Sequence, residues 1–117
     1  MERAMSDEKQ LIEASLGGDG GAFQHLIEGH RGKLRSIVLR MVADPADADD
    51  LVQETLIQAY QKLGSFRGDS AFSTWLVSIA SRKSIDHLRK RSRWTREAQI
   101  ISRAAAHADE SMLDRMS

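Results

Sequence analysis

The residues that could do chemistry in this chain are charged, and their signs are segregated. Residues 82–96 hold seven Lys or Arg side chains and one acid, whereas residues 44–54 hold five acids and no base. A basic segment of this density can neutralise several phosphates, which gives salt-dependent binding to nucleic acid without sequence preference. The formal net charge of zero hides this contrast. The two segments indicate two different partners, or one partner that has two faces.

No set of side chains typical of an enzyme is evident. We find no nucleophile–base pair and no carboxylate dyad with a pocket. The glycine-rich residues 17–21 lack the Lys and Ser/Thr of a phosphate-binding loop. His25 and His30 are five residues apart and do not share a helix face, so we expect His30 to pack in the core rather than to bind a metal. We therefore expect a binding protein that uses no metal and no cofactor, and not an enzyme.

The composition points to one soluble domain. The chain has 117 residues, 29% of them charged and none of them cysteine, which excludes disulfides and cysteine-type zinc sites. Its polar N-terminus resembles neither a signal peptide nor an anchor, and no apolar run has the length of a membrane span. We expect a cytoplasmic protein without membrane insertion, a context in which the Arg-Gly-Asp triplet at residues 67–69 does not indicate cell adhesion.

Apolar residues spaced three and four apart predict helices over residues 22–42, over residues 45–63 and from about residue 71 through residue 88 and beyond. A shorter helix is expected to start at a Ser6 or Asp7 cap and to end at the glycines of 17–21. No strand pattern appears. The expected fold is all-α, a compact bundle of three to four main helices.

Several local features refine this prediction. Asp44 followed by Pro45 is a typical helix start, and Asp69 or Ser70 can cap the last helix. Gly29 and Gly32 indicate either a close helix crossing or a bend. On the helix after Pro45 we expect these residues to be buried: Leu51, Val52, Thr55, Leu56, Ala59, Tyr60 and Leu63. Residues 97–117 are compatible with a helix, but their weak pattern favours a loose tail or a linker.

One side of the acidic helix carries a polar stripe. Its members are spaced i, i+3, i+4 and i+7, and they are Asp50, Gln53, Glu54 and Ile57. Acids and glutamines on a helix usually form a solvated face. Ile57, however, could be the apolar centre of a contact patch for a partner.

The loop before the last helix is the second informative surface. Aromatic residues near basic ones can stack on unpaired nucleobases, and Phe66, Phe72, Trp75 and Trp94 lie close to the basic segment. The spacing of Phe72 and Trp75 favours a core position for both. The loop backbone, and the free N–H groups at the helix start near residues 70–73, are better candidates for contact with a base or a phosphate.

Several segments together resemble region 2 of the bacterial sigma factors of the sigma-70 family, in particular the extracytoplasmic-function (ECF) group. The most specific are "DLVQET" and "FRGDSAFSTWL", at this separation and followed by a basic helix. The resemblance covers roughly residues 7–93. It implies a region 2 domain over residues 1–93, with residues 94–117 as a linker or tail towards a second (region 4) domain that we do not find in this chain.

The resemblance also implies a function, namely transcription initiation without a cofactor. In the family, the stripe helix docks on the clamp helices of the largest-subunit pair of core RNA polymerase, which maps to Asp50, Gln53, Glu54 and Ile57. A loop captures one unpaired base flipped from the promoter minus-ten element, which maps to Phe66, Arg67, Gly68, Asp69, Ser70, Phe72 and Ser73. A basic helix holds the minus-ten region, which maps to Arg82, Lys83, Asp86, His87, Arg89, Lys90 and Arg91.

Two departures from the family pattern leave alternatives open. Arg82 stands where the family commonly has the Asn that helps to form the flipped-base pocket, so the accepted base is open. The sequence also supplies no second domain, and it can be either an excised domain or a naturally short protein. Both departures favour, as an alternative, a sigma-like regulatory module that binds polymerase or an anti-sigma factor without initiating transcription. We expect an anti-sigma factor to compete with polymerase around Ile57.

Overall fold

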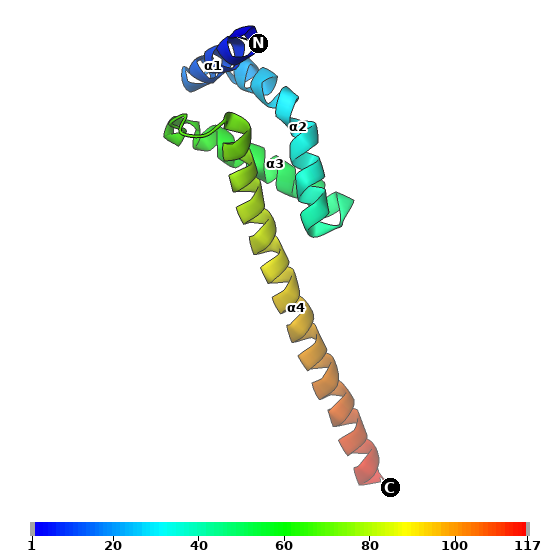
Figure 1. Ribbon diagram of the computed structural model, residues 1–117. Coiled ribbons are helices and arrows are strands. Elements are labelled where there is room, and N and C mark those ends of the chain that lie inside the picture. The colour runs from blue at the N-terminus through cyan, green and yellow to red at the C-terminus, as the bar shows by residue number, and fades with distance from the viewer. Residues whose placement is uncertain (1, 117) are drawn as a thin grey trace. The chain divides into compact units, whose positions relative to one another are not determined.

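The computed structural model describes the backbone of residues 2–116 and the side chains of residues 7–108. Its elements are α1 (Glu2–Leu16), α2 (Gly20–Val42), α3 (Pro45–Gln61), the short 3-10 helix η1 (Leu63–Ser65) and α4 (Phe72–Met116) (Figure 1). No strand occurs within residues 2–116. The predicted all-α class is confirmed, with four main helices where three to four were expected.

The helix boundaries follow from their capping residues. Asp19 accepts a hydrogen bond from the Ala22 N–H at 3.1 Å and starts α2. Asp44 accepts from the Asp47 N–H at 3.0 Å, with Pro45 in the first turn of α3, as the sequence predicts. The predicted cap at Ser6 or Asp7 is wrong, because α1 already begins at Glu2. Its first residues, Glu-Arg-Ala-Met, are good helix formers and extend the helix.

Two compact units make up the chain, the first ending at Ile85 and the second beginning at Asp86. In the first, α1 packs on α2, α2 packs on α3, and η1 lies against α1 and α3. The start of α4 contributes Phe72, Leu76, Ala80 and Ser84, all buried. Leu34, Val38 and Leu76 are among the largest fully buried side chains, so the core of this unit is mainly aliphatic, with Phe23 and Phe72 buried beside them.

The buried polar side chains of this core form hydrogen bonds within their own helices. Ser15, Thr55 and Ser84 are buried, and each hydroxyl donates to the backbone carbonyl four residues earlier in its own helix. Two polar pairs between helices lie nearer the surface. His30 Nε2 is 3.0 Å from Glu8 Oε1, and Arg35 Nε donates to Asp49 Oδ1 at 2.7 Å.

The glycines in the middle of α2 do not mark a close helix crossing. A Cβ built at Gly29 or at Gly32 would meet no atom within 4 Å. Both residues also lie within an uninterrupted helix from Gly20 to Val42. The close-approach interpretation is therefore wrong, because both glycines face open space.

The second unit consists of the α4 residues from Asp86 onwards. From Arg89 to Ala108 every described side chain is exposed, including Trp94, Ile100 and Ile101. The helix continues through Met116, so residues 97–116 are helical and not a loose tail. The boundary between residues 93 and 94 that the family resemblance implies stays a prediction.

Candidate functional site

The predicted polar stripe lies on the solvent-facing side of α3. Asp50, Gln53, Glu54 and Ile57 are all exposed, and Ile57 keeps 51% of its surface accessible. The opposite side of the helix supplies the buried residues Leu51, Val52, Thr55, Leu56 and Ala59. The structure thus brings all four predicted residues together on one face, beside the core. An apolar side chain as large as Ile57 is left without cover among acids and amides.

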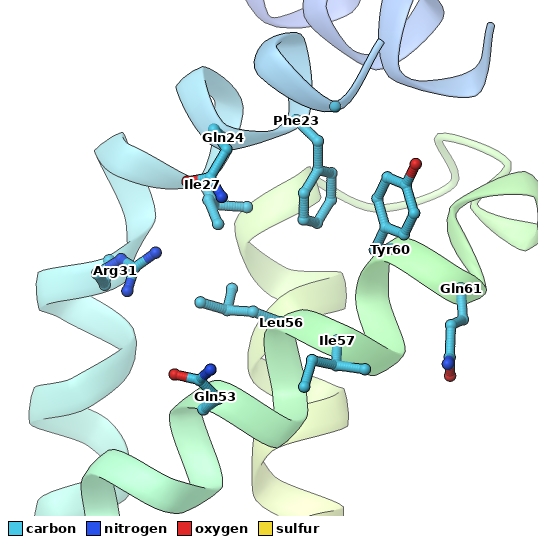
Figure 2. Close-up of a pocket in the computed structure, with 10 residues that line it drawn as sticks. Phe23, Gln24, Ile27, Arg31, Gln53, Leu56, Ile57, Tyr60 and Gln61 are labelled. Carbon is cyan, nitrogen blue, oxygen red and sulfur yellow. The ribbon is translucent and has the colours of Figure 1, made fainter. Parts of the chain in front are cut away.

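A groove of about 380 Å³ runs beside this stripe, between α2 and α3. In Figure 2, Phe23, Gln24, Ile27 and Arg31 line it from α2. Gln53, Leu56, Ile57, Tyr60 and Gln61 line it from α3. The floor is apolar, and the rim carries amides and the Arg31 guanidinium. Such a groove suits an amphipathic partner helix whose polar flanks can meet the amides and charges at the rim.

The groove wall explains one wrong prediction. Tyr60 was expected in the core but is 46% exposed. Its ring stands edge-on to Phe23, with centroids 5.0 Å apart and planes at 70°. The apolar body of the ring therefore packs while its hydroxyl edge reaches solvent. Arg31 and Gln24 were missed, because their role depends on which face of α2 meets α3.

An aromatic cluster holds the loop between η1 and α4. The Phe66 centroid lies 5.6 Å from that of Phe72 and 5.3 Å from that of Trp75, and Phe72 lies 5.8 Å from Trp75. The His30 ring also meets Phe72 edge-on at 5.4 Å. Phe72 is buried, and Phe66 and Trp75 are half-buried. The predicted core position of Phe72 is confirmed. That of Trp75 is only partly correct, because its side chain is half-buried.

Between these anchors the loop presents four exposed residues, Arg67, Gly68, Asp69 and Ser70. Gly68 has φ 79°, a left-handed conformation that side-chain-bearing residues rarely adopt. The chain reverses direction here with its backbone accessible. A ligand can therefore approach the loop backbone closely.

The predicted cap of α4 by Asp69 or Ser70 is wrong. The helix begins at Phe72, and the carbonyl of Ala71 accepts the first helical hydrogen bond, from the Trp75 N–H at 3.1 Å. Ala71 has no side-chain acceptor, and the Ser70 hydroxyl donates to the Ala71 carbonyl at 3.4 Å. Within residues 7–108, no side chain accepts from the N–H groups of Phe72 to Thr74. These donors stay available beside half-buried Ser73.

A hollow of about 750 Å³ adjoins the loop. The loop side consists of Phe66, Arg67, Gly68 and Phe72, and the other side consists of Glu8, Lys9, Ile12 and Glu13 from α1. Sequence reasoning missed the α1 residues, because nothing local links residue 8 to residue 67. Glu8 is also the partner of His30, so the wall of the hollow is tied to α2.

The remaining predicted DNA-binding residues lie on α4. In the first unit, Arg82 is exposed and Lys83 is half-buried. In the second unit, Asp86, Arg89, Lys90 and Arg91 are exposed, and His87 is half-buried. The exposed cations can all reach a polyanion, and an arginine keeps its charge at any physiological pH.

Other kinds of site were sought in the described part of the chain. It contains no group of three or more His, Cys, Asp or Glu residues that could hold a metal ion. None of the helices over residues 2–116 is both long and apolar enough to cross a membrane.

Comparison with known proteins identifies the family. The model of the sigma-70 region 2 family matches residues 26–94, which include the stripe, the loop and the start of the basic segment. The chain belongs to the sigma-70 region 2 family. This confirms the resemblance that the "DLVQET" and "FRGDSAFSTWL" segments predict.

Individual relatives agree with this assignment. The chain is 39% identical to the RNA polymerase sigma-H factor of Pseudomonas aeruginosa over 98 residues, which are 84% of this chain and 51% of that protein. It is 45% identical to the ECF RNA polymerase sigma-E factor of Escherichia coli over 78 residues, which are 67% of this chain and 40% of that protein. The chain therefore spans about half the length, or less, of these curated relatives.

A solved structure shares the fold. An engineered region 2 of sigmaE, determined by NMR in complex with GTAAAA, superposes with a TM-score of 0.68. The two are 37% identical, and the match covers 74% of this chain and 90% of the other. The helical architecture described above is thus the architecture of a sigma region 2 domain.

Proposed function

We propose that this domain docks on core RNA polymerase and recognises the promoter minus-ten element as single-stranded DNA, helping to melt it by capturing one flipped base. The observation that carries the proposal is the exposed, backbone-accessible loop from Arg67 to Ser70, anchored between Phe66 and Phe72. It belongs to a region 2 domain whose sigmaE relative is in complex with GTAAAA. The domain acts as a binding module in the cytoplasm and not as an enzyme.

The polymerase-binding half rests on the stripe and its groove. A clamp helix of the largest-subunit pair would lie along Asp50, Gln53, Glu54 and Ile57 and would cover the 380 Å³ groove beside them. Ile57 would supply buried apolar area, while the two carboxylates would pair with cations at the rim. Rim charges mainly set association rate and specificity, and the buried centre of an interface sets most of the affinity.

The DNA-binding half rests on the loop. Extruding a base costs a few kcal/mol, which the pocket must offset by contacts to the base and its phosphates. The loop offers Arg67 for a phosphate, the open backbone at Gly68, and the uncapped N–H groups at the start of α4. Arg82 replaces the Asn common in the family, and it favours a guanine or a phosphate partner for this side chain.

Charge reversal tests the docking half. The variant Asp50→Lys/Glu54→Lys should bind core polymerase at least about tenfold more weakly, because like charges facing each other across an interface cost several kcal/mol. The matched control Asp7→Lys/Glu28→Lys changes the same charge at exposed positions outside the groove. Equal affinity of the parent and the stripe variant in a pull-down titration would disprove the docking site.

Fluorescence anisotropy tests the DNA half. The chain should bind a single-stranded oligonucleotide that contains GTAAAA or a single-base variant of it more tightly than a scrambled one at moderate salt. Equal binding to all of them would leave only a basic helix that contacts phosphates.

The alternative is a regulatory module that occupies polymerase, or an anti-sigma factor, without initiating transcription. It is favoured by Arg82, which stands where the family commonly has the Asn that helps to form the flipped-base pocket. Run-off transcription with this chain and core polymerase decides between the two, because efficient initiation excludes the regulatory module. An anti-sigma factor that competes at Ile57 should protect the stripe from hydrogen exchange and should be displaced by core polymerase.

A further inference from the structure

The α4 helix of the second unit carries a straight row of arginines, which we name the arginine stripe: Arg89, Arg93, Arg96 and Arg103. Their spacing of four, three and seven residues places them on one face of a helix that turns about 100° per residue. All four side chains are exposed. At about 1.5 Å per residue, the row extends over roughly 21 Å.

The charge of this row is not neutralised by the described side chains. No ion pair with another described side chain occupies any of the four guanidinium groups. Within residues 86–108 there are six Lys or Arg side chains and two acids, Asp86 and Glu97, an excess of four positive charges. Arginine stays charged at any physiological pH and forms paired hydrogen bonds to phosphate oxygens.

The aromatic side chain of this unit points elsewhere. Trp94, 72% exposed, shares a face with Ala98, Ile101 and Ala105, at spacings of four, three and four residues. This face lies about 150° around the helix from the arginine stripe. Stacking on unpaired bases needs an aromatic ring beside the cations, and the stripe has only Ile100 between Arg96 and Arg103. The stripe therefore suits a regular row of phosphates better than splayed single-stranded bases.

We propose that the arginine stripe binds the phosphate backbone of double-stranded DNA, adding a sequence-independent contact to the single-stranded one. A strand of duplex DNA has one phosphate per roughly 3.4 Å of axis, so a row of about 21 Å faces some six phosphates. The inference rests on and extends the proposed function. Arg89, Arg93 and Arg96 lie in the basic segment of residues 82–96, but only Arg89 is among the residues mapped to the minus-ten region, and Arg103 lies outside the segment. Arg96 and Arg103 align with Arg89 because the helix continues where a tail was expected.

The test uses the full chain with two DNA probes, a random-sequence duplex of about 20 base pairs, longer than the roughly 21 Å stripe, and the single-stranded GTAAAA oligonucleotide. The stripe variant is Arg93→Gln/Arg96→Gln/Arg103→Gln. A control variant, Lys33→Gln/Arg40→Gln/Lys62→Gln, removes the same charge at exposed positions in the first unit. Far-UV circular dichroism serves as the folding control, and both variants should keep the parental helix content.

In the stripe variant, the slope of log K for the duplex against log salt should become shallower by about 2.7, at 0.9 per lost phosphate contact. Duplex affinity at 0.1 M salt should fall roughly 500-fold, because a slope change of about 2.7 acts over one decade of salt below 1 M. The control variant should keep the parental slope, and the single-stranded affinity should change much less than the duplex affinity.

Three results would overturn the proposal: an unchanged slope, an equal loss in both variants, or tighter binding of polyglutamate than of the duplex, which would indicate an acidic protein partner. The two proposals fail separately. If the parent chain does not bind the GTAAAA oligonucleotide but the stripe variant loses affinity for the duplex, the minus-ten proposal is wrong and the proposal for the arginine stripe is supported.

Discussion

A single methyl group at Gly68 tests whether the conformation of the loop matters for binding. Gly68 has φ 79°, and a Cβ there would meet no atom within 4 Å. Gly68→Ala therefore introduces no clash with a neighbour, and its only direct effect is on the backbone. A side-chain-bearing residue in the left-handed region costs about 1–2 kcal/mol relative to its ordinary conformation.

This cost must appear in one of two measurable quantities. If the loop keeps its shape, the free energy of unfolding falls by about 1–2 kcal/mol. If the free loop relaxes into another shape, stability is kept, and the affinity for the minus-ten strand falls by about 5–30-fold, the equivalent factor. The structure predicts the sum of the loss in unfolding free energy and the loss in binding free energy. This sum is about 1–2 kcal/mol, however it is divided between folding and binding.

Two further variants separate conformation from bulk. Gly64 also has open space around a built Cβ, but it lacks a positive φ, so Gly64→Ala should leave both quantities nearly unchanged. Asn tolerates the left-handed region better than Ala does, so Gly68→Asn should recover part of the loss. The assays are urea unfolding and fluorescence anisotropy with the GTAAAA oligonucleotide. If the summed loss for Gly68→Ala does not exceed that for Gly64→Ala, the reasoning is refuted.

Three predictions concern stability, all measured by urea unfolding. Gly29→Ala and Gly32→Ala should each stabilise the protein by about 1 kcal/mol, since both lie in a helix and face open space; a loss would mean that a neighbour covers this face. Ala43→Gly should stabilise by roughly 0.5–1 kcal/mol, because Ala43 ends α2 at φ 58°; a neutral result would show that the strain is negligible. Leu76→Ala should cost about 2–5 kcal/mol, because Leu76 is fully buried, and an effect below about 1 kcal/mol would contradict its place in the core.

Local chemistry made much of the fold predictable from the sequence. Asp44 and Pro45 start α3 by a capping bond and a fixed φ, which depend only on adjacent residues. Residues 17–21 end α1 for a similarly local reason. The last helix was predicted from about residue 71 and begins at Phe72, and the predicted cap at Asp69 or Ser70 is wrong, because alternative starts compete within one turn.

The errors that remain concern which helix faces meet. Tyr60 has core spacing, but it lies at the edge of the groove against Phe23. Arg31 lines the groove beside α3, and Glu8 lines the hollow beside the loop. Each of them belongs to a helix that is distant in the sequence from the surface it completes. Helical periodicity gives the direction of a side chain around its own helix, and it carries no information about the neighbour that the side chain meets.

The buried hydroxyl groups have a consequence for how the helices hold together. The hydroxyl groups of Ser15, Thr55 and Ser84 each donate to a carbonyl of their own helix. None of these hydrogen bonds therefore fixes the position of a neighbouring helix. Two polar pairs that cross between helices, Glu8 with His30 and Arg35 with Asp49, lie towards solvent, where they are weak.

Cohesion in the centre of this unit is therefore non-directional. It depends on the shapes of aliphatic side chains such as Leu34, Val38 and Leu76, and not on buried polar contacts with a fixed geometry. Small sliding movements of one helix along another would leave the hydrogen bonds of Ser15, Thr55 and Ser84 intact, and these are the buried polar side chains among the described residues. A domain packed in this way can adjust its helix register by shear when a partner settles against its surface.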